Sequence, residues 1–441
     1  MKRPLRRRLA DLERDFRVKL IRPLQIDHAL RVRRRAKGTF IGVTGSSAKS
    51  TTATLITAIL EGEGMVNAQI FDNTINPLLK TIRASEGADF VVAETGVGGP
   101  GQMPDMARLL CPDVAVVTLI GREHFSQFRS REAIAAEKGA LVAALRPGGL
   151  AVLNGDDDLA SGMAARTGAR VIRFGESAEA DCRITAITGD ALSGITVTLD
   201  WQGRPLVLPT RFPARHFALP VTAAAATGLA LGVAPERIAA AIARVAPLPT
   251  RFSRHDIPGG PVVFADCAKA PRDTLGLAFE ALRDAPAPRR RIVIGSISDY
   301  GDKRRKVQRE AVEAALLCAD EVVLVADRSH RGSVLPEAEA KGRLLQVQTV
   351  EEAATHVVAT ALPGEVILLK GSEFQHLERI LLALAGPVRC WSHDCGVSGS
   401  CMDCGLHHLP FEANRGMHRG ARRLRKARRS RQAPPKVQET P

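Results

Sequence analysis

The stretch that most constrains this sequence is GVTGSSAKSTT, residues 42–52, which directly follows the apolar run TFI. A strand, a glycine-containing turn and then Lys-Ser-Thr-Thr at the start of a helix is the arrangement in which backbone N–H groups and a helix N-terminus hold phosphates. In that arrangement Lys49 reaches the outer phosphates and Ser50 can bind Mg²⁺. The stretch therefore predicts a nucleotide-binding loop, against the alternative of a Ser/Gly turn that only caps a helix.

One position in this stretch departs from the usual pattern. Ala48 stands directly before the lysine, where glycine is usual because the backbone must curl tightly around a phosphate. An alanine fits there if its φ stays negative. We therefore expect a negative φ at Ala48 and a loop that still binds phosphate, at some cost in affinity.

The rest of the chain alternates between two kinds of segment. From Thr39 onward, short β-branched runs such as FVVAE alternate with alanine- and leucine-rich stretches, which indicates βαβ units and a parallel sheet. Residues 171–211 are typical of antiparallel strands joined by polar turns, and two helices follow them. A second α/β series begins after the prolines of VAPLPTRF. We predict an α/β fold with a P-loop domain built on a parallel sheet, a smaller Rossmann-like C-terminal domain and a short cysteine-rich tail.

Charge is concentrated at the two ends of the chain. Residues 1–37 hold 14 basic and 4 acidic residues and residues 409–441 hold 10 and 2, which leaves 38 basic and 41 acidic residues between them. The core is therefore slightly acidic, and this argues against a nucleic-acid-binding body. No stretch has the roughly 18 apolar residues of a membrane span, and the N-terminus has no signal-peptide pattern, so we expect a cytoplasmic protein.

Each basic end supports its own prediction. The first 37 residues form an N-terminal extension in which apolar residues at helical spacing predict a basic amphipathic helix; they are Leu5, Leu9, Leu12 and Phe16. That helix would either pack on the body with solvated arginines or contact an anionic membrane, a polyanion or a protein partner. The tail over residues 409–441 is expected to be disordered and to contact RNA or anionic lipid at most.

Three further polar residues stand near predicted strand ends or on a predicted helix. Glu94 ends the run FVVAE, His124 follows DVAVVTLI, and Lys138 lies in the helical stretch SREAIAAEKGAL. Open α/β sheets build their sites beyond the carboxyl ends of the strands, so Glu94 and His124 are expected near the loop. Each also has a structural alternative: a solvated glutamate, a structural histidine and a surface lysine.

Taken in order, these segments resemble the Mur ligase superfamily, ATP-dependent enzymes that join a carboxylate to an amine. TGSSAKSTT is similar to the family's TGSSGKTT loop, VVAETGVGGPGQM to its strand ending in Glu-x-Gly, and CPDVAVVTLIGREHFSQFRSREAIAAEKGAL to its PD strand, histidine and Ala-Lys helix. FADCAKAPRDTL, IVIGSISDYGDKRR and ILLKGSEFQHLERIL resemble signatures of its C-terminal domain. The resemblance covers residues 38–388, is closest to the muramyl-tripeptide:D-alanyl-D-alanine ligase branch, and implies an ATP-binding central domain at 38–249 and a C-terminal domain at 250–388.

The resemblance implies roles for particular positions. The residues around the ATP phosphates would be Gly45, Ser46, Ser47, Ala48, Lys49, Ser50 and Thr51. Magnesium would be held by Ser50, Glu94, His124 and a carbamylated Lys138, and with Lys49 the last three would form the catalytic group. Asn73 and Asn76 would lie near the substrate. Arg251 and Asp266 would reach the nucleotide from the second domain, and a hinge would bring Asp266 and Lys269 over the loop.

The implied reaction is ADP-forming. The γ-phosphoryl group would pass from ATP to the acid to give an acyl phosphate, which an amine or amino acid then attacks. Three departures from the family pattern bear on this expectation. Lys269 stands where relatives commonly carry His or Asn, and residues 215–217 lack the expected His-Asn pair. Only 37 residues precede the first strand, where muramyl ligases carry a UDP-sugar-binding domain, so we expect small-molecule substrates other than a standard UDP-muramyl peptide.

Two other classes of function stay open at this point. The first is a catalytically weak nucleotide-binding scaffold or regulatory subunit of the same fold, which Ala48 favours. The second is a nucleic-acid-binding protein with an unrelated P-loop domain, which the acidic core disfavours. The joint presence of Lys49, Glu94, His124 and Lys138 favours the enzyme.

The cysteines fall into two groups. Cys390, Cys395, Cys401 and Cys404 crowd into fifteen residues of the segment 389–408, and four thiolates suit a tetrahedral structural Zn²⁺, with His407 and His408 as spare nitrogens. An iron–sulfur cluster and ordinary reduced thiols are the alternatives. The other cysteines are scattered, as reduced buried thiols usually are; they are Cys111, Cys182, Cys267 and Cys318.

Overall fold

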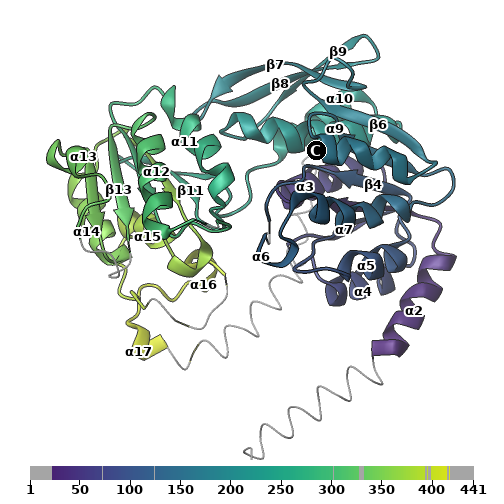
Figure 1. Cartoon of the computed structure of the whole chain (residues 1–441), viewed down its shortest axis with the longest axis horizontal. Coiled ribbons are helices and arrows are strands. Elements are labelled where there is room, and N and C mark those ends of the chain that lie inside the picture. The colour runs from purple at the N-terminus through teal and green to yellow at the C-terminus, as the bar shows by residue number, and fades with distance from the viewer. Residues whose placement is uncertain are drawn as a thin grey trace, which may run out of the picture. The chain divides into compact units, whose positions relative to one another are not determined.

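The computed structural model describes residues 22–71, 73–123, 125–300, 302–326, 332–392, 395, 399–414 and 417. The chain forms two compact units that divide between Ala246 and Pro247 (Figure 1). The predicted amphipathic helix of Leu5 to Phe16 and nearly all of the basic tail lie outside the described residues.

The first unit is built on a nine-stranded sheet of order β2-β3-β1-β4-β5-β6-β7-β8-β9. Its strands are β1 (Thr39–Thr44), β2 (Val66–Gln69), β3 (Phe90–Glu94), β4 (Val114–Val117), β5 (Leu150–Asn154), β6 (Arg170–Gly175), β7 (Cys182–Asp190), β8 (Gly194–Trp201) and β9 (Arg204–Pro209). Neighbouring strands from β2 to β7 pair in parallel, and β7, β8 and β9 pair antiparallel. The predicted change from parallel to antiparallel strands is confirmed. The antiparallel strands begin at β7 and not at β6, which still pairs in parallel with β5.

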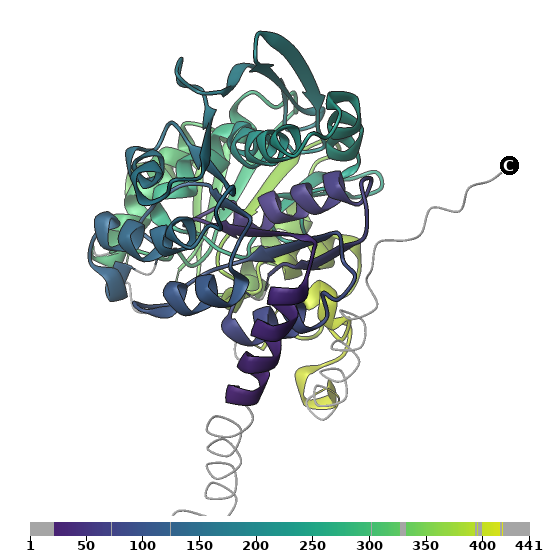
Figure 2. The same ribbon diagram turned by 90° about the vertical axis from the view of Figure 1, so that its right-hand side faces the viewer.

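The central strands β3, β4 and β5 are buried and apolar up to their carboxyl ends, because helices cover both faces of the sheet; β3 ends in Glu94 and β5 in Asn154. The helices of this unit are α2 (Arg22–Arg35), α3 (Lys49–Leu60), α4 (Ile75–Arg83), α5 (Gln102–Leu110), α6 (Phe125–Phe128), α7 (Arg131–Ala143), α8 (Asp158–Ser161), α9 (Ala218–Ala230) and α10 (Pro235–Arg244), with the 3-10 helices η2 (Gly162–Arg166) and η3 (Arg215–Phe217). α4, α5 and α7 close one core with side chains that include Ile82, Met106, Ile134 and Leu141, whereas α3 packs with α9 and α10. Strands β7–β9 lie at the opposite end of the unit from α2 (Figures 1 and 2).

The described part of the N-terminal extension, α2, packs on α4 and α5. Arg33 is buried and donates through Nε to Leu110 O at 2.7 Å and through Nη2 to Cys111 O at 2.6 Å and Asp113 Oδ2 at 2.8 Å. Its guanidinium also lies 3.9 Å from the centre of the Phe40 ring. For this segment the structure therefore shows packing on the body, with Arg33 buried where the prediction had only solvated arginines.

The second unit holds a six-stranded sheet of order β10-β11-β15-β12-β13-β14, in which β10 alone is antiparallel to its neighbour. The strands are β10 (Ser253–Asp256), β11 (Val262–Asp266), β12 (Arg290–Ile294), β13 (Glu321–Val325), β14 (Leu344–Val347) and β15 (Val366–Lys370). The helices are η4 (Arg272–Thr274), α11 (Leu275–Arg283), α12 (Arg304–Leu316), α13 (Pro336–Ala340), α14 (Val350–Thr360), η5 (Glu373–Gln375), α15 (Glu378–Ala385), α16 (Cys401–Cys404) and α17 (Phe411–Asn414). The predicted second α/β domain is confirmed. Among the described residues, none of the helices combines the length and apolar character that crossing a membrane requires.

Candidate active site

The loop between β1 and α3 has the predicted strand–turn–helix form, but Ala48 has the opposite backbone conformation to the one we expected. Its φ is 64° and its ψ is −2°, in the left-handed region, so the prediction of a negative φ was wrong. Gly45 has a φ of 144°, and a Cβ added there would lie 1.9 Å from Thr118 Oγ1. The loop therefore needs glycine at position 45, and it adopts at position 48 a conformation that glycine favours.

The segment that follows β4 holds the loop in this shape. Ser46 N donates to Leu119 O at 2.8 Å, and Thr118 Oγ1 donates to Ser47 O at 2.6 Å. The segment is fixed in turn, because Ile120 N donates to an Asp157 carboxylate oxygen at 2.7 Å. These tertiary contacts explain how an alanine is kept in an unfavourable region.

The N-terminus of α3 is open toward the loop. Ala48 offers no side-chain cap, and the first turn of the helix contains no acidic residue. The backbone N–H groups of the first turn, which belong to Lys49, Ser50 and Thr51, have no partner within the helix. An uncapped N-terminus without a carboxylate suits an anion, and a phosphate supplies both the charge and the acceptors.

Two buried lysines meet at the carbonyl oxygen of Gly45. Lys49 Nζ and Lys138 Nζ each donate to it at 2.8 Å, although Lys138 is on α7. Both also pair with the Glu123 carboxylate, at 3.2 Å and 3.5 Å. The structure therefore brings the buried side chain of the predicted Lys138 to the loop and adds Glu123, which the sequence reasoning missed.

Glu94 lies at the end of β3, opposite Val43 in the neighbouring β1. Its side chain accepts from Phe71 N at 2.9 Å and from Asn73 Nδ2 at 3.2 Å, and the residue is only 3 % exposed. Both donors are neutral, and no cationic side chain pairs with this carboxylate among the described residues. A buried carboxylate without a cation is costly, so its surroundings suit a metal ion.

The other residues predicted around the metal have different outcomes. His124 lies outside the described residues, and Asn76 is in the first turn of α4. Ser50 lies in the first turn of α3, and its carbonyl oxygen accepts from Thr54 Oγ1 at 2.8 Å. Within the described part of the chain, no three His, Cys, Asp or Glu ligand atoms gather near the loop closely enough to form a ready-made metal site.

In the second unit, the predicted nucleotide-contacting residues lie around the ends of β11 and β15. Lys370 Nζ bonds to Asp266 Oδ2 at 2.7 Å and to the carbonyl oxygen of Lys269 at 2.9 Å. Arg251 lies between two residues with positive φ, Thr250 at 58° and Phe252 at 60°. Positive φ is a rare conformation for a β-branched residue such as threonine, and backbone strain of this kind concentrates at functional sites.

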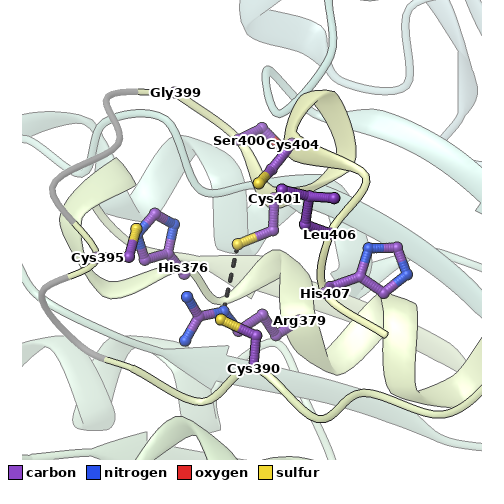
Figure 3. Close-up of a pocket in the computed structure, with 10 residues that line it drawn as sticks. All are labelled: His376, Arg379, Cys390, Cys395, Gly399, Ser400, Cys401, Cys404, Leu406 and His407. Carbon is purple, nitrogen blue, oxygen red and sulfur yellow. Dashed lines mark hydrogen bonds between the residues drawn. The ribbon is translucent and has the colours of Figure 1, made fainter. Parts of the chain in front are cut away.

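The four clustered cysteines surround one pocket at the end of the second unit (Figure 3). Their sulfur atoms are not gathered into the compact group of four that we predicted. Among the described residues, the one group with ligand atoms all within 4.8 Å of one another is His376, Glu378 and Cys401. Burial raises the pKa of the Cys401 thiol to about 12, so without a bound metal this thiol is protonated at neutral pH. The scattered cysteines are all free thiols and are buried except Cys111, which is half-buried.

Comparison with known proteins places these features in a family. Residues 43–228 match the Mur ligase middle domain, and residues 250–373 match the Mur ligase glutamate ligase domain. A UDP-N-acetylmuramoyl-tripeptide–D-alanyl-D-alanine ligase of Mycobacterium leprae is 30 % identical over 391 residues, which cover 79 % of this chain and 74 % of that protein. The chain belongs to the Mur ligase family. The ligase of the same name from Mycobacterium tuberculosis strain CDC 1551 is 29 % identical to this chain over 384 residues, which cover 80 % of this chain and 74 % of that protein.

Solved structures give the same assignment for the fold. A crystal structure of MurF from Acinetobacter baumannii matches this Mur ligase with a TM-score of 0.72 at 22 % identity, covering 81 % of this chain and 79 % of that chain. MurF ligase from Thermotoga maritima in complex with ADP matches with a TM-score of 0.70 at 22 % identity, covering 82 % and 83 %. The family is one of ATP-dependent ligases, which agrees with the loop geometry.

Two residues of this Mur ligase were missed by the sequence reasoning. Glu123 stands directly before the predicted His124, and an acidic residue immediately after a strand-end segment is a signal that could have identified it. His376 carried no such signal, because it lies 14 positions before the first clustered cysteine and in a segment that resembles a helix. Its φ of 57° instead separates η5 from α15.

Proposed function

We propose that this Mur ligase is an ADP-forming enzyme that joins a carboxylic acid to an amine through an acyl phosphate. The observation that carries the proposal is the open N-terminus of α3 beside two buried lysines that share the Gly45 carbonyl oxygen. An acid cannot react with an amine in water without activation, because its oxygen is a poor leaving group. Phosphorylation by ATP makes that oxygen a good leaving group.

The charges around the loop support phosphoryl transfer. Lys49, Lys138 and Glu123 together carry one net positive charge, in a place largely removed from water. In such surroundings a fixed positive charge stabilises the negative charge that develops on the transferred phosphoryl group. Lys49 follows the loop directly and is the residue to which we assign this role.

Magnesium fits the oxygen donors at this end of the sheet. Glu94 and Ser50 supply hard oxygen ligands, and Glu94 is a buried carboxylate with only neutral partners. A bound Mg²⁺ would neutralise charge on the phosphates and orient them. We place His124 in the same set on the resemblance alone. Lys138 as an ammonium is a donor and cannot ligate a cation, so we propose that it joins the set only as a carbamate, which would turn the net charge of the lysine–glutamate group negative.

The second unit would contribute Arg251 and Asp266. Asp266 is held by Lys370, so its orientation is fixed by the two strand ends that carry them. Lys269 lies on the same turn, and Ala268 N donates to Thr250 O at 3.1 Å, which ties that turn to the strained segment around Arg251. We propose that these residues contact the nucleotide once it is bound.

The names of the relatives suggest where a search for the acid and the amine should begin. Purified protein should be given ATP, Mg²⁺, D-alanyl-D-alanine or pools of amino acids, and pools of carboxylic acids. The expected result is ADP release that requires both an acid and an amine. With acid labelled by ¹⁸O in its carboxylate, one label should appear in the released phosphate, because that oxygen leaves with the phosphoryl group.

A matched pair of variants separates the loop from general effects. Lys49→Met removes the ammonium at the loop and should abolish ADP release, whereas Lys80→Met removes an exposed ammonium on α4 and should leave it unchanged. Binding of an ATP analogue without turnover of any acid and amine would favour a nucleotide-binding scaffold, the function that Ala48 favours. Label that stays in the acid would contradict an acyl phosphate.

A further inference from the structure

The tail that follows α15 folds back to form a sulfur-lined pocket with it. Side chains from η5–α15 and from the tail line the pocket (Figure 3); they are His376, Arg379, Cys390, Cys395, Gly399, Ser400, Cys401, Cys404, Leu406 and His407. The tail is held by backbone bonds, since Arg389 N and Cys390 N both donate to His407 O at 2.8 and 3.0 Å. Four thiols and two imidazoles line this one pocket, and none of them belongs to the loop site.

Cys401 and Cys404 are presented by a tight turn. Ser400 begins it, because its side chain accepts from Met402 N at 3.0 Å and its carbonyl oxygen accepts from Cys404 N at 3.0 Å. Gly405 ends it with a φ of 66° and donates to Cys401 O at 3.0 Å. Both sulfur atoms point to the same side (Figure 3). A Cys-x2-Cys spacing on such a turn is common at structural zinc sites, where it places two thiolates on one ion.

His376 is oriented as metal-bound histidines are. Its Nε2 faces the Cys395 sulfur at 3.8 Å, and its Nδ1 lies 3.3 Å from Glu378 Oε1. Thiolate and imidazole ligands of one tetrahedral Zn²⁺ are about 3.5 Å apart, from metal–ligand bonds of about 2.3 and 2.0 Å. A carboxylate behind the other ring nitrogen is the usual means of fixing the ligand orientation. The same Glu378 oxygen accepts from Cys401 N at 2.8 Å, so one carboxylate orients two members of the group.

The buried positive charge of Arg379 would also be stabilised by an anion. Its guanidinium is always positive, and the residue is 2 % exposed. It donates through Nε to the Cys401 sulfur at 3.2 Å and through Nη1 to Ser392 O at 2.8 Å. One acceptor is a sulfur and the other a carbonyl oxygen, and no carboxylate pairs with Arg379 in the described part of the chain. A thiolate bound to a metal would supply the missing negative charge.

We propose that Cys395, Cys401, Cys404 and His376 bind one Zn²⁺ ion. Binding would release three thiol protons to water and form three Zn–S bonds and one Zn–N bond. Three thiolates and Zn²⁺ carry one net negative charge. Arg379 adds one positive charge beside them, and the Glu378 carboxylate adds one negative charge. Three ligands belong to the tail and one to the body of the second unit, so the ion fastens the tail to that unit. Neither the loop site nor the proposed reaction enters this argument.

Cys390 is the residue that distinguishes this ligand set from a set of four cysteines. It lines the pocket beside Arg379, on the side away from Cys404 (Figure 3). With Cys390 in place of His376, four thiolates and Zn²⁺ would give a net charge of minus two beside one arginine and the Glu378 carboxylate. The geometry around His376 therefore favours the histidine, and Cys390 is expected to be dispensable for metal binding.

The test measures metal in the purified, reduced full-length protein by mass spectrometry. We expect one zinc per chain in the unaltered protein, in Cys390→Ser and in the control Cys318→Ser, a buried cysteine elsewhere in the second unit. Cys401→Ser and His376→Ala should lose the zinc and lower the unfolding temperature, and a chelator should lower it in the unaltered protein. His376→Cys offers a fourth thiolate and should restore binding, which keeps the test informative where His376→Ala fails to fold.

Replacement of zinc by Co²⁺ gives a second reading of the ligand set. Three thiolates and an imidazole around Co²⁺ should produce the intense visible absorption of a tetrahedral site, which Cys390→Ser should leave in place and His376→Cys should shift. The proposal is overturned by a reduced protein that takes up neither metal. Iron with acid-labile sulfide would also overturn it, and so would zinc that is kept in His376→Ala but lost in Cys390→Ser.

Discussion

The left-handed alanine of the loop offers the most direct test of the structure. At Ala48, with φ 64° and ψ −2°, an L-residue costs about 1–2 kcal/mol more than in the right-handed region. Glycine avoids that cost but adds about 0.5–1 kcal/mol of chain entropy to the unfolded state. The change Ala48→Gly should therefore stabilise the first unit by roughly 0.5–1 kcal/mol, which for a unit of this size corresponds to about 1–4 °C in Tm.

A control with the same chemical change should move in the opposite direction. Ala136 is exposed in the middle of α7, where glycine costs about 1 kcal/mol relative to alanine. Ala136→Gly should lower the Tm of the first unit by about 2–4 °C. Comparing Ala48→Gly with Ala136→Gly removes the general effects of replacing alanine by glycine. The difference in Tm between the two variants then reports the sign of φ at the two positions.

The assay can be made specific to the first unit. The chain has two tryptophans, Trp201 on β8 and Trp391 in the tail of the second unit. In a Trp391→Phe background, fluorescence reports the unfolding of the unit that contains the loop. A decrease in Tm for Ala48→Gly, similar to that for Ala136→Gly, would refute a positive φ at Ala48. Binding of an ATP analogue by Ala48→Gly should be equal or tighter, because the loop keeps its shape with less strain.

Three other changes give sharp expectations. Gly45→Ala places a Cβ 1.9 Å from Thr118 Oγ1 and should displace the loop, so binding of an ATP analogue in a calorimeter should be lost and the Tm of the first unit should fall. Arg33→Lys keeps the charge of Arg33 but not its several directed hydrogen bonds, and should cost about 1–3 kcal/mol in denaturant unfolding of the same unit. Burial lowers the pKa of His255 below its ordinary value of 6.5, so the unfolded chain binds more protons there. Its contribution to the stability of the second unit is thus present above that value and lost as the pH falls below it, and His255→Gln should reduce the loss between pH 8 and pH 5.

The elements that could be predicted from the sequence are those that local patterns determine. The loop follows from a glycine turn between an apolar run and a helix start, and Glu94 from its place at the end of a β-branched run. The residues of each such signal lie within a few positions of one another, so the signal can be recognised without knowledge of the tertiary structure. β2 was not predicted, because only one of its four residues is buried and two of them are asparagine and glutamine.

The features that could not be predicted depend on partners far away in the chain. An alanine by itself favours negative φ. Ala48 has a positive φ because the loop is hydrogen-bonded to the segment after β4, about seventy residues later in the chain. Lys138 reaches the carbonyl oxygen of Gly45 across 93 positions, and Glu123 is recognisable as its partner only when both are in place. His376 meets Cys395 in the same way, through a tail that folds back on α15.

The two proposed metal sites follow from one electrostatic argument with opposite signs. Glu94 in the first unit and Arg379 in the second are both buried. In the described part of the chain, no cationic side chain pairs with Glu94 and no carboxylate pairs with Arg379. Leaving one buried charge unpaired costs several kcal/mol, and a folded protein has only about 5–15 kcal/mol of stability in total. A chain that keeps two such charges therefore needs compensation from outside its own side chains. At Glu94 the missing charge is positive and the available ligand is a carboxylate oxygen, which suits Mg²⁺. At Arg379 it is negative and the neighbours are thiols, which become anionic when a Zn²⁺ ion displaces their protons.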